Sequence, residues 1–216
     1  MPATTPKPPT SMPAGGATRP SLSVRFSARD LVSVAIFSVI YFVIVLAIAM
    51  LGIISPLVML LTLPLSAIAA GIPYMLFLTR ARHPGMTTLF GIVLGLLELM
   101  IGHPWQGVLV MIAVSVLGDL ILWAGRYRST WAAIWTYTVF SCWFIGPWIP
   151  FFANPDEYLR SDHMSGMGDG YLAAFEQIVS APAVLAMIAA TIVCGFLGAL
   201  LGTKLLRKHF RRAGLA

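Results

Sequence analysis

Charged side chains are scarce in this chain of 216 residues, and acidic ones are the scarcest. Lys and Arg together number 14 and Asp and Glu number eight, so charged residues form 10% of the sequence, against 58% hydrophobic residues. A soluble globular domain carries roughly 25% charged residues. So few charges cannot cover a water-facing surface, which argues against soluble, disordered and nucleic-acid-binding proteins despite the net charge of +6.

Cysteine is nearly absent, and the common catalytic motifs are missing. Cys142 and Cys194 both lie in apolar runs, which is typical of small buried hydrophobic residues rather than of disulfides or metal ligands. The sequence has no Gly-x-Ser-x-Gly, no His-Glu-x-x-His and no phosphate-binding Gly-x-x-x-x-Gly-Lys-Ser/Thr. We therefore expect no enzyme activity, no catalytic residues, no metal site, no cofactor and no direct use of ATP.

Long apolar runs dominate the sequence instead. A bilayer core of about 30 Å requires roughly 20 apolar residues per helix. The runs predict an all-α integral membrane protein, a bundle of six transmembrane helices in which the third and fourth are short. Residues 1–24, rich in Pro, Ser and Thr, predict a disordered cytoplasmic tail, and residues 25–216 one membrane domain. The six runs are 31–54, 57–79, 86–102, 108–124, 131–152 and 178–206.

The distribution of Lys and Arg predicts the orientation of this bundle. Thirteen of the 14 basic residues fall in the two termini and in the connections after the second and fourth runs, and Arg160 is the exception. Cytoplasmic segments of membrane proteins retain Lys and Arg. Both termini of this multi-pass protein are therefore predicted to be cytoplasmic in the cell membrane. The long fifth-to-sixth connection, at about 153–177, is predicted to be extracellular, as either a folded cap or a solvated acidic loop.

Polar and aromatic residues gather at the predicted outer end. Ionisable residues inside membrane helices are costly and default to functional hypotheses. Glu98, near the outer end of its helix, is the better ligand candidate, whereas Asp119 is predicted to be structural, in a helix-end ion pair or a subunit contact. Apolar walls with a few polar groups are typical of small-ligand sites. The ligand-binding candidates are Glu98, His103, Trp105, Gln106, Trp148, Asn154, His163, Met167 and Tyr171.

Five segments together resemble one family. They are 71–79, 102–105, 146–150, 165–171 and 204–214, and with six helices they resemble the MptD (Trep-Strep) family of substrate-binding S components of energy-coupling-factor (ECF) transporters. The resemblance implies a subunit that captures a small nutrient at the outer face. It also implies partners: a transmembrane coupling protein and two cytoplasmic ATPases. The identity of the ligand stays open.

The coupling protein of such a transporter would dock on small residues of the first helix. S components often carry Ala-x-x-x-Ala there, and this chain departs from that pattern. The basic tail could bind anionic membrane lipid or a cytoplasmic partner. The docking candidates are Ser33, Ala35, Ser38, Lys204, Arg207 and Lys208.

Three other functions compete with this one. A stand-alone secondary transporter commonly shows matching broken helices in its two halves, which this sequence does not display. An intramembrane enzyme is disfavoured by the missing motifs. A non-catalytic membrane scaffold or assembly factor is also compatible with the sequence. Gly91-x-x-x-Gly95 and Gly198-x-x-x-Gly202 predict close helix packing, within this bundle rather than in a dimer.

Overall fold

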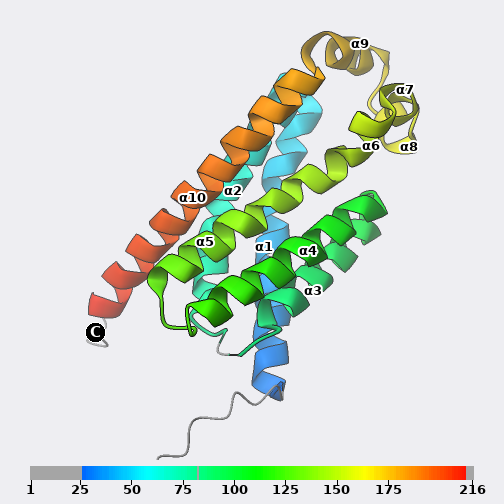
Figure 1. The fold of residues 1–216 in the computed structure, drawn as a ribbon. Helices are drawn as coiled ribbons and strands as arrows, with labels where there is room; N and C mark the ends of the chain where they lie inside the picture. Colours follow the sequence, from blue (N-terminus) through cyan, green and yellow to red (C-terminus); the bar gives the residue numbers. More distant parts are fainter. Residues whose placement is uncertain (1–25, 82, 213–216) are drawn as a thin grey trace, which may run out of the picture.

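The computed structural model describes residues 26–81 and 83–212, except for the side chains of residues 162, 163 and 209–212. The predicted amino-terminal tail therefore lies outside the described residues. The described chain is helical and folds into a long bundle with a group of short helices over one end (Figure 1). Its elements are α1 (Ala28–Ala49), η1 (Met50–Ile54), α2 (Pro56–Leu78), α3 (Met86–Met100), α4 (Trp105–Ala124), α5 (Thr130–Phe140), η2 (Ser141–Trp148), α6 (Ile149–Ala153), α7 (Pro155–Leu159), α8 (Asp162–Ser165), α9 (Asp169–Ile178) and α10 (Ala181–Arg212).

Four of these helical segments are long and apolar enough to cross a membrane: α1 with η1, α2, α4 and α10. Helix α3, with 15 residues, is shorter than the usual span. The predicted fifth helix is not one regular helix, because α5 gives way to the 3-10 turns of η2 and then to α6. Pro147 and Pro150 lack the N–H groups that a continuous α-helix would need there. The count of six spans stays a prediction.

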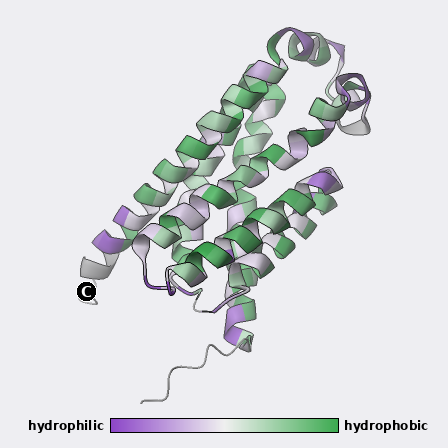
Figure 2. Cartoon of the chain, in the orientation of Figure 1, coloured by the Kyte–Doolittle hydropathy of each residue, from purple (hydrophilic) through white to green (hydrophobic). Residues whose placement is uncertain are grey.

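The two ends of the bundle differ in charge. One end of the bundle, here called the cap end, carries the short helices α6 to α9, here called the cap. The α1–α2 and α3–α4 turns lie at the same end (Figure 1). The opposite end is here called the basic end. It contains the start of α1, the end of α10 and the α2–α3 and α4–α5 connections. Figure 2 shows hydrophilic residues at both ends and a hydrophobic middle. Described basic residues of the basic end are Arg29, Arg80, Arg126, Arg128, Lys204, Arg207 and Lys208.

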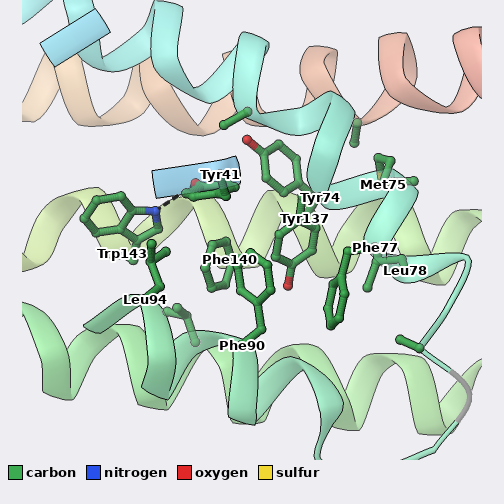
Figure 3. Packing of buried hydrophobic residues seen from close by; sticks show 14 of the residues in the cluster. Tyr41, Tyr74, Met75, Phe77, Leu78, Phe90, Leu94, Tyr137, Phe140 and Trp143 are labelled. Atoms are coloured by element: carbon green, nitrogen blue, oxygen red, sulfur yellow. Dashed lines mark hydrogen bonds between the residues drawn. The ribbon is translucent and has the colours of Figure 1, made fainter. Parts of the chain in front are cut away.

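Buried aromatic rings fill the middle of the bundle (Figure 3). Tyr74 of α2 stacks on Phe140 of α5 with ring centroids 4.6 Å apart, and Tyr41 of α1 meets Phe90 of α3 edge-on at 5.7 Å. The indole Nε1 of Trp143 donates a hydrogen bond of 3.0 Å to the hydroxyl oxygen of Tyr41. Such rings each bury a large apolar area in defined geometry. The middle of the bundle is therefore a packed core.

Glycines let neighbouring helices approach closely, as both small-residue motifs predicted. A Cβ on Gly71 of α2 would lie 2.6 Å from the carbonyl carbon of Gly198 on α10. On α3, a Cβ on Gly95 would lie 2.9 Å from a methyl group of Val108 on α4. In lipid, such close approach adds dispersion contacts between helices. Gly91 likewise packs against α4, so both motifs are used inside the bundle.

The predicted long connection is a folded cap rather than an irregular loop. Residues 155–178 form α7, α8 and α9. Their apolar side chains join a second core, in which Met164 and Phe175 are buried together with Trp148 and Phe151 from η2 and α6. The four acidic side chains of this segment that the structure describes are on its outside, since Asp156, Glu157, Asp169 and Glu176 are all exposed.

Candidate functional site at the cap end

The first component of the site is a carboxylate–imidazole pair at the end of α3. Oε2 of Glu98 lies 2.6 Å from Nδ1 of His103. The Glu98 side chain is 6% exposed and the His103 side chain 35% exposed. The pair thus places a buried acid behind an imidazole that reaches the surface of the chain.

The backbone explains why His103 turns back onto Glu98. Helix α3 ends in a Schellman motif, in which the N–H of His103 donates to the carbonyl of Glu98 at 3.1 Å. In the same motif, the N–H of Gly102 donates to the carbonyl of Leu99, also at 3.1 Å. This turn requires a left-handed residue, which Gly102 supplies with φ of 90°. The sequence Glu-Leu-Met-Ile-Gly-His therefore dictates the pair locally.

Two more candidates follow directly in the first turn of α4. Trp105 is the first residue of this helix and is mostly exposed. Gln106 is half-buried, and its side-chain oxygen is buried with no hydrogen-bond partner among the described residues. A buried amide oxygen without a donor is costly, of the order of 1–3 kcal/mol. The turn therefore offers a carboxylate, an imidazole and an unused amide acceptor within nine residues of sequence, 98–106.

Close packing joins this turn to the passage that leads into the cap. A Cβ on Gly146 of η2 would lie 2.5 Å from Cα of Gly107 on α4. Gly107 in turn faces the ring of Pro147, 3.6 Å from the position of its missing Cβ. The segment that carries Glu98 and His103 thus abuts the segment that carries Trp148.

The predicted ligand residues of the cap itself have structural contacts. Trp148 is buried and packs edge-on against Phe151 at 5.8 Å. Asn154 caps α7: its Oδ1 accepts the N–H of Glu157 at 3.3 Å and its Nδ2 donates to the Glu157 carboxylate at 3.1 Å. The hydroxyl of Tyr171 donates to the carbonyl of Gly52 at 3.0 Å. These three side chains therefore hold the cap together.

Two predicted ligand residues remain, Met167 and His163. Met167 is half-buried in the turn before α9, and the side chain of His163 lies outside the described part of the chain. The described residues contain no group of three or more His, Cys, Asp or Glu side chains that could hold a metal ion.

The predicted docking residues fall on two surfaces. On α1, Ala35 is exposed and Ser33 half-buried, but Ser38 is fully buried inside the bundle and is not available to a partner in this arrangement. On α10, the side chains of Lys204, Arg207 and Lys208 are all exposed at the basic end.

Asp119 has contacts that sequence reasoning missed. Its Oδ2 accepts the N–H of Thr88 at 2.9 Å and the Thr88 hydroxyl at 2.5 Å, and its Oδ1 accepts the N–H of Thr87 at 3.3 Å. These donors belong to the first turn of α3, whose own N-cap residue is Gly85 and has no side-chain acceptor. Asp119 of α4 thus caps α3 from a neighbouring helix. The role of Asp119 is thus structural, as the sequence predicted, with a helix cap in place of the expected ion pair.

Comparisons with known proteins identify the family. Neither curated proteins nor solved structures gave a match to this chain. A family model described as hypothetical bacterial integral membrane protein (Trep_Strep) matches residues 28–212, which is nearly all of the described chain. The chain therefore belongs to the Trep_Strep family of bacterial integral membrane proteins.

Proposed function

We propose that this protein is the ligand-capturing membrane subunit of an ATP-driven importer, an S component of the energy-coupling-factor type. The observation that supports it most directly is the pair formed by Glu98 and His103 at the cap end, with Oε2 and Nδ1 2.6 Å apart. A carboxylate buried in an apolar chain is expensive unless it has a partner. His103 is that partner in the structure, and a ligand with a cationic or hydrogen-bond-donating group is a substitute of matching chemistry.

The proposed mechanism assigns no catalysis to this chain. With both termini in the cytoplasm and the cap outside, a small nutrient enters from the medium and its polar group meets Glu98, His103 and the Gln106 amide. Trp105, at the mouth of the same turn, supplies an apolar wall. The cap then closes over the ligand, and two cytoplasmic ATPases drive its release through a coupling protein.

The coupling protein is proposed to dock along α1. Of the four long apolar segments, α1 with η1 is the least covered by the rest of the chain. Its uncovered face displays Ala35 together with β-branched and other apolar side chains. Lys204 and Lys208, which project from α10 at the basic end, would meet the ATPase side of the complex.

Co-purification and ligand retention test this proposal together. The tagged chain, expressed with its native neighbouring proteins, should co-purify with a coupling protein and two ATPases and retain a small molecule identifiable by mass spectrometry. The Glu98→Gln variant should bind that molecule about 10- to 100-fold more weakly, because a charge-assisted hydrogen bond contributes about 1.5–3 kcal/mol. His103→Ala and Trp105→Ala should also weaken binding.

Met100→Ala is the matched control, since the side chain of this neighbour on the same turn is largely exposed and the substitution should leave the dissociation constant unchanged. Unaltered binding in Glu98→Gln, His103→Ala and Trp105→Ala together would remove this turn from the ligand site.

A proton-coupled secondary transporter is the second candidate, and the same pair favours it. Glu98 and His103 are an acid and a base in ion-pair contact, 2.6 Å apart, of the kind that proton-driven carriers use. Uptake in a host that lacks coupling proteins and ATPases separates the two functions. Accumulation that collapses with the proton gradient would support the carrier, and absence of uptake until the partners are supplied would support the importer subunit.

A further inference from the structure

A pocket of about 650 Å³ opens at the basic end, between α2, the α4–α5 connection, α5 and α10. It lies at the opposite end of the bundle from Glu98 and His103, so it is not part of the proposed ligand site. Its floor is apolar and is formed by core residues such as Leu78, Leu122 and Leu206. Its polar lining residues are Thr79, Tyr127, Arg128, Ser129, Thr130, Thr203 and Arg207.

The charge of this pocket is positive. Two guanidinium groups, those of Arg128 and Arg207, belong to its lining, and the lining has no acidic residue. The acids nearest this end are engaged elsewhere: Asp119 caps α3, and Asp30 caps α1 through Ser27. An anion entering the pocket would therefore meet two cations that no described acidic side chain neutralises.

The local backbone fixes these groups in place. Arg126 and Tyr127 both have left-handed backbone conformations, with φ of 51° and 55°. Such conformations are costly for residues with side chains, and they persist where the surrounding structure imposes them. They turn the chain so that Arg128 lines the pocket immediately before α5. Nη2 of Arg207 reaches from α10 to within 3.5 Å of the Thr130 hydroxyl on α5.

Exposed tryptophans place the pocket at the depth of lipid headgroups. Trp123, near the end of α4, and Trp131, in the first turn of α5, are both more than half exposed. Tryptophan is enriched where a membrane meets water, with its ring at the headgroup level. Trp131 is adjacent in sequence to the pocket residue Thr130. At that depth the arginines of the pocket would meet lipid headgroups and its apolar floor would meet acyl chains.

We propose that this pocket binds an anionic phospholipid from the adjoining leaflet. Arg128 and Arg207 hold its phosphate, the hydroxyl of Thr130 offers a further donor, and the first carbons of the acyl chains cover the apolar floor. Arginine suits this role because its planar fork of N–H donors matches phosphate oxygens. The charge complementarity and the mixed lining favour an amphiphile over a fully water-soluble anion.

Native mass spectrometry of the full chain in detergent tests this proposal with defined lipids. Dioleoyl phosphatidylglycerol should bind with a lower dissociation constant than dioleoyl phosphatidylcholine. Arg128→Gln and Arg207→Gln should each weaken phosphatidylglycerol binding about fivefold, since a basic residue at an anionic membrane surface contributes about 1 kcal/mol. Ala133→Trp, which fills the pocket without changing charge, should also weaken it.

Lys208→Gln is the matched control, because Lys208 follows Arg207 on α10, is exposed and does not line the pocket. It should change binding by less than about twofold, as expected for a solvent-screened charge. An equal loss in Lys208→Gln and Arg207→Gln would overturn the proposal, because binding would then depend on net charge. Equal binding of the two lipids, or equally tight binding of free glycerol phosphate, would overturn it as well.

Discussion

The hydroxyl of Tyr171 on α9 donates a hydrogen bond of 3.0 Å to the backbone carbonyl of Gly52, across 119 positions of sequence. The same hydroxyl lies 3.4 Å from Sδ of Met59 on α2. The cap is thereby joined to the turn between α1 and α2 by a polar contact, in addition to the apolar packing of Phe175. Any closure of the cap over a ligand must keep or break this contact.

Removing that hydroxyl should loosen the cap without unfolding the bundle. Tyr171→Phe keeps the ring but leaves the Gly52 carbonyl without this donor, so we expect a loss of about 1 kcal/mol, the usual contribution of one hydrogen bond. Hydrogen exchange of residues 155–178 should accelerate while that of α2 and α10 stays unchanged. Tyr158→Phe is the control, since it removes a tyrosine hydroxyl from the same cap and leaves the hydrogen bond between Tyr171 and Gly52 in place. Equal exchange in Tyr171→Phe and the unmodified protein would contradict this role.

The cap should also lose stability at alkaline pH. Burial, reinforced by the neighbouring Tyr171, raises the pKa of Tyr158 to about 12 from its ordinary value of about 10. The unfolded chain then binds fewer protons than the folded chain between these two values. The stability that Tyr158 contributes is fully present below a pH of about 10 and falls as the pH rises toward about 12.

Thermal unfolding followed across this alkaline window measures the effect. Each pKa unit corresponds to about 1.4 kcal/mol, so a rise from about 10 to about 12 corresponds to about 3 kcal/mol at most. In Tyr158→Phe the alkaline loss should shrink while stability near pH 7 is retained. An identical pH profile in both proteins would show that Tyr158 does not control it.

Sequence patterns predicted the features that depend on local composition. Apolar runs marked α1 with η1, α2, α3 and α4 to within a few residues, and the Lys and Arg pattern separated the basic end from the cap end. The glycine spacing 198–202 predicted a close helix contact inside the bundle. The pairing of His103 with Glu98 was also readable in principle, because Gly102 in a Schellman turn places the next residue over the last turn of α3.

Features that depend on distant segments could not be predicted in this way. The partners of Asp119 are Thr87 and Thr88, some 31 residues earlier, and no local pattern links them. Trp148 was predicted to wall a ligand site and Tyr171 to contribute to it from the long connection, because aromatic residues form binding sites and packed cores alike. The structure places Trp148 in the core of the cap. Four separate segments line the pocket at the basic end, so this pocket can be recognised only in the folded chain.

The contact between α2 and α10 should tolerate no added methyl group. Gly71→Ala would place Cβ about 2.6 Å from the Gly198 carbonyl carbon, which is backbone and cannot rotate away. The helices must separate, at an expected cost of about 1–3 kcal/mol in the free energy of unfolding. Gly170→Ala is the control, because a Cβ there meets nothing within 4 Å. A Gly71→Ala protein as stable as Gly170→Ala would show that the helices are not packed as described.

The cap that Asp119 provides for α3 should be the most costly polar contact of the bundle to remove. Asp119→Ala leaves two backbone N–H groups and the Thr88 hydroxyl without this acceptor, and hydrogen bonds to a charged group contribute about 1.5–3 kcal/mol each. Because the remaining groups can partly relax toward water, we expect a total loss of about 2–4 kcal/mol. Thermal unfolding in detergent measures it.

Asp119→Asn separates the charge of this residue from its shape. In Asp119→Asn the side-chain oxygen can still accept one of the N–H groups, but the side-chain NH₂ group faces the Thr88 donors. The free energy of unfolding of this variant should therefore lie between that of the unmodified protein and that of Asp119→Ala. Binding at the cap end should be unaffected in both variants when they are folded, because Asp119 lies toward the opposite end from Glu98. If Asp119→Ala unfolded at the temperature of the unmodified protein, α3 would not depend on this cap. The observed hydrogen bonds would then be incidental to stability.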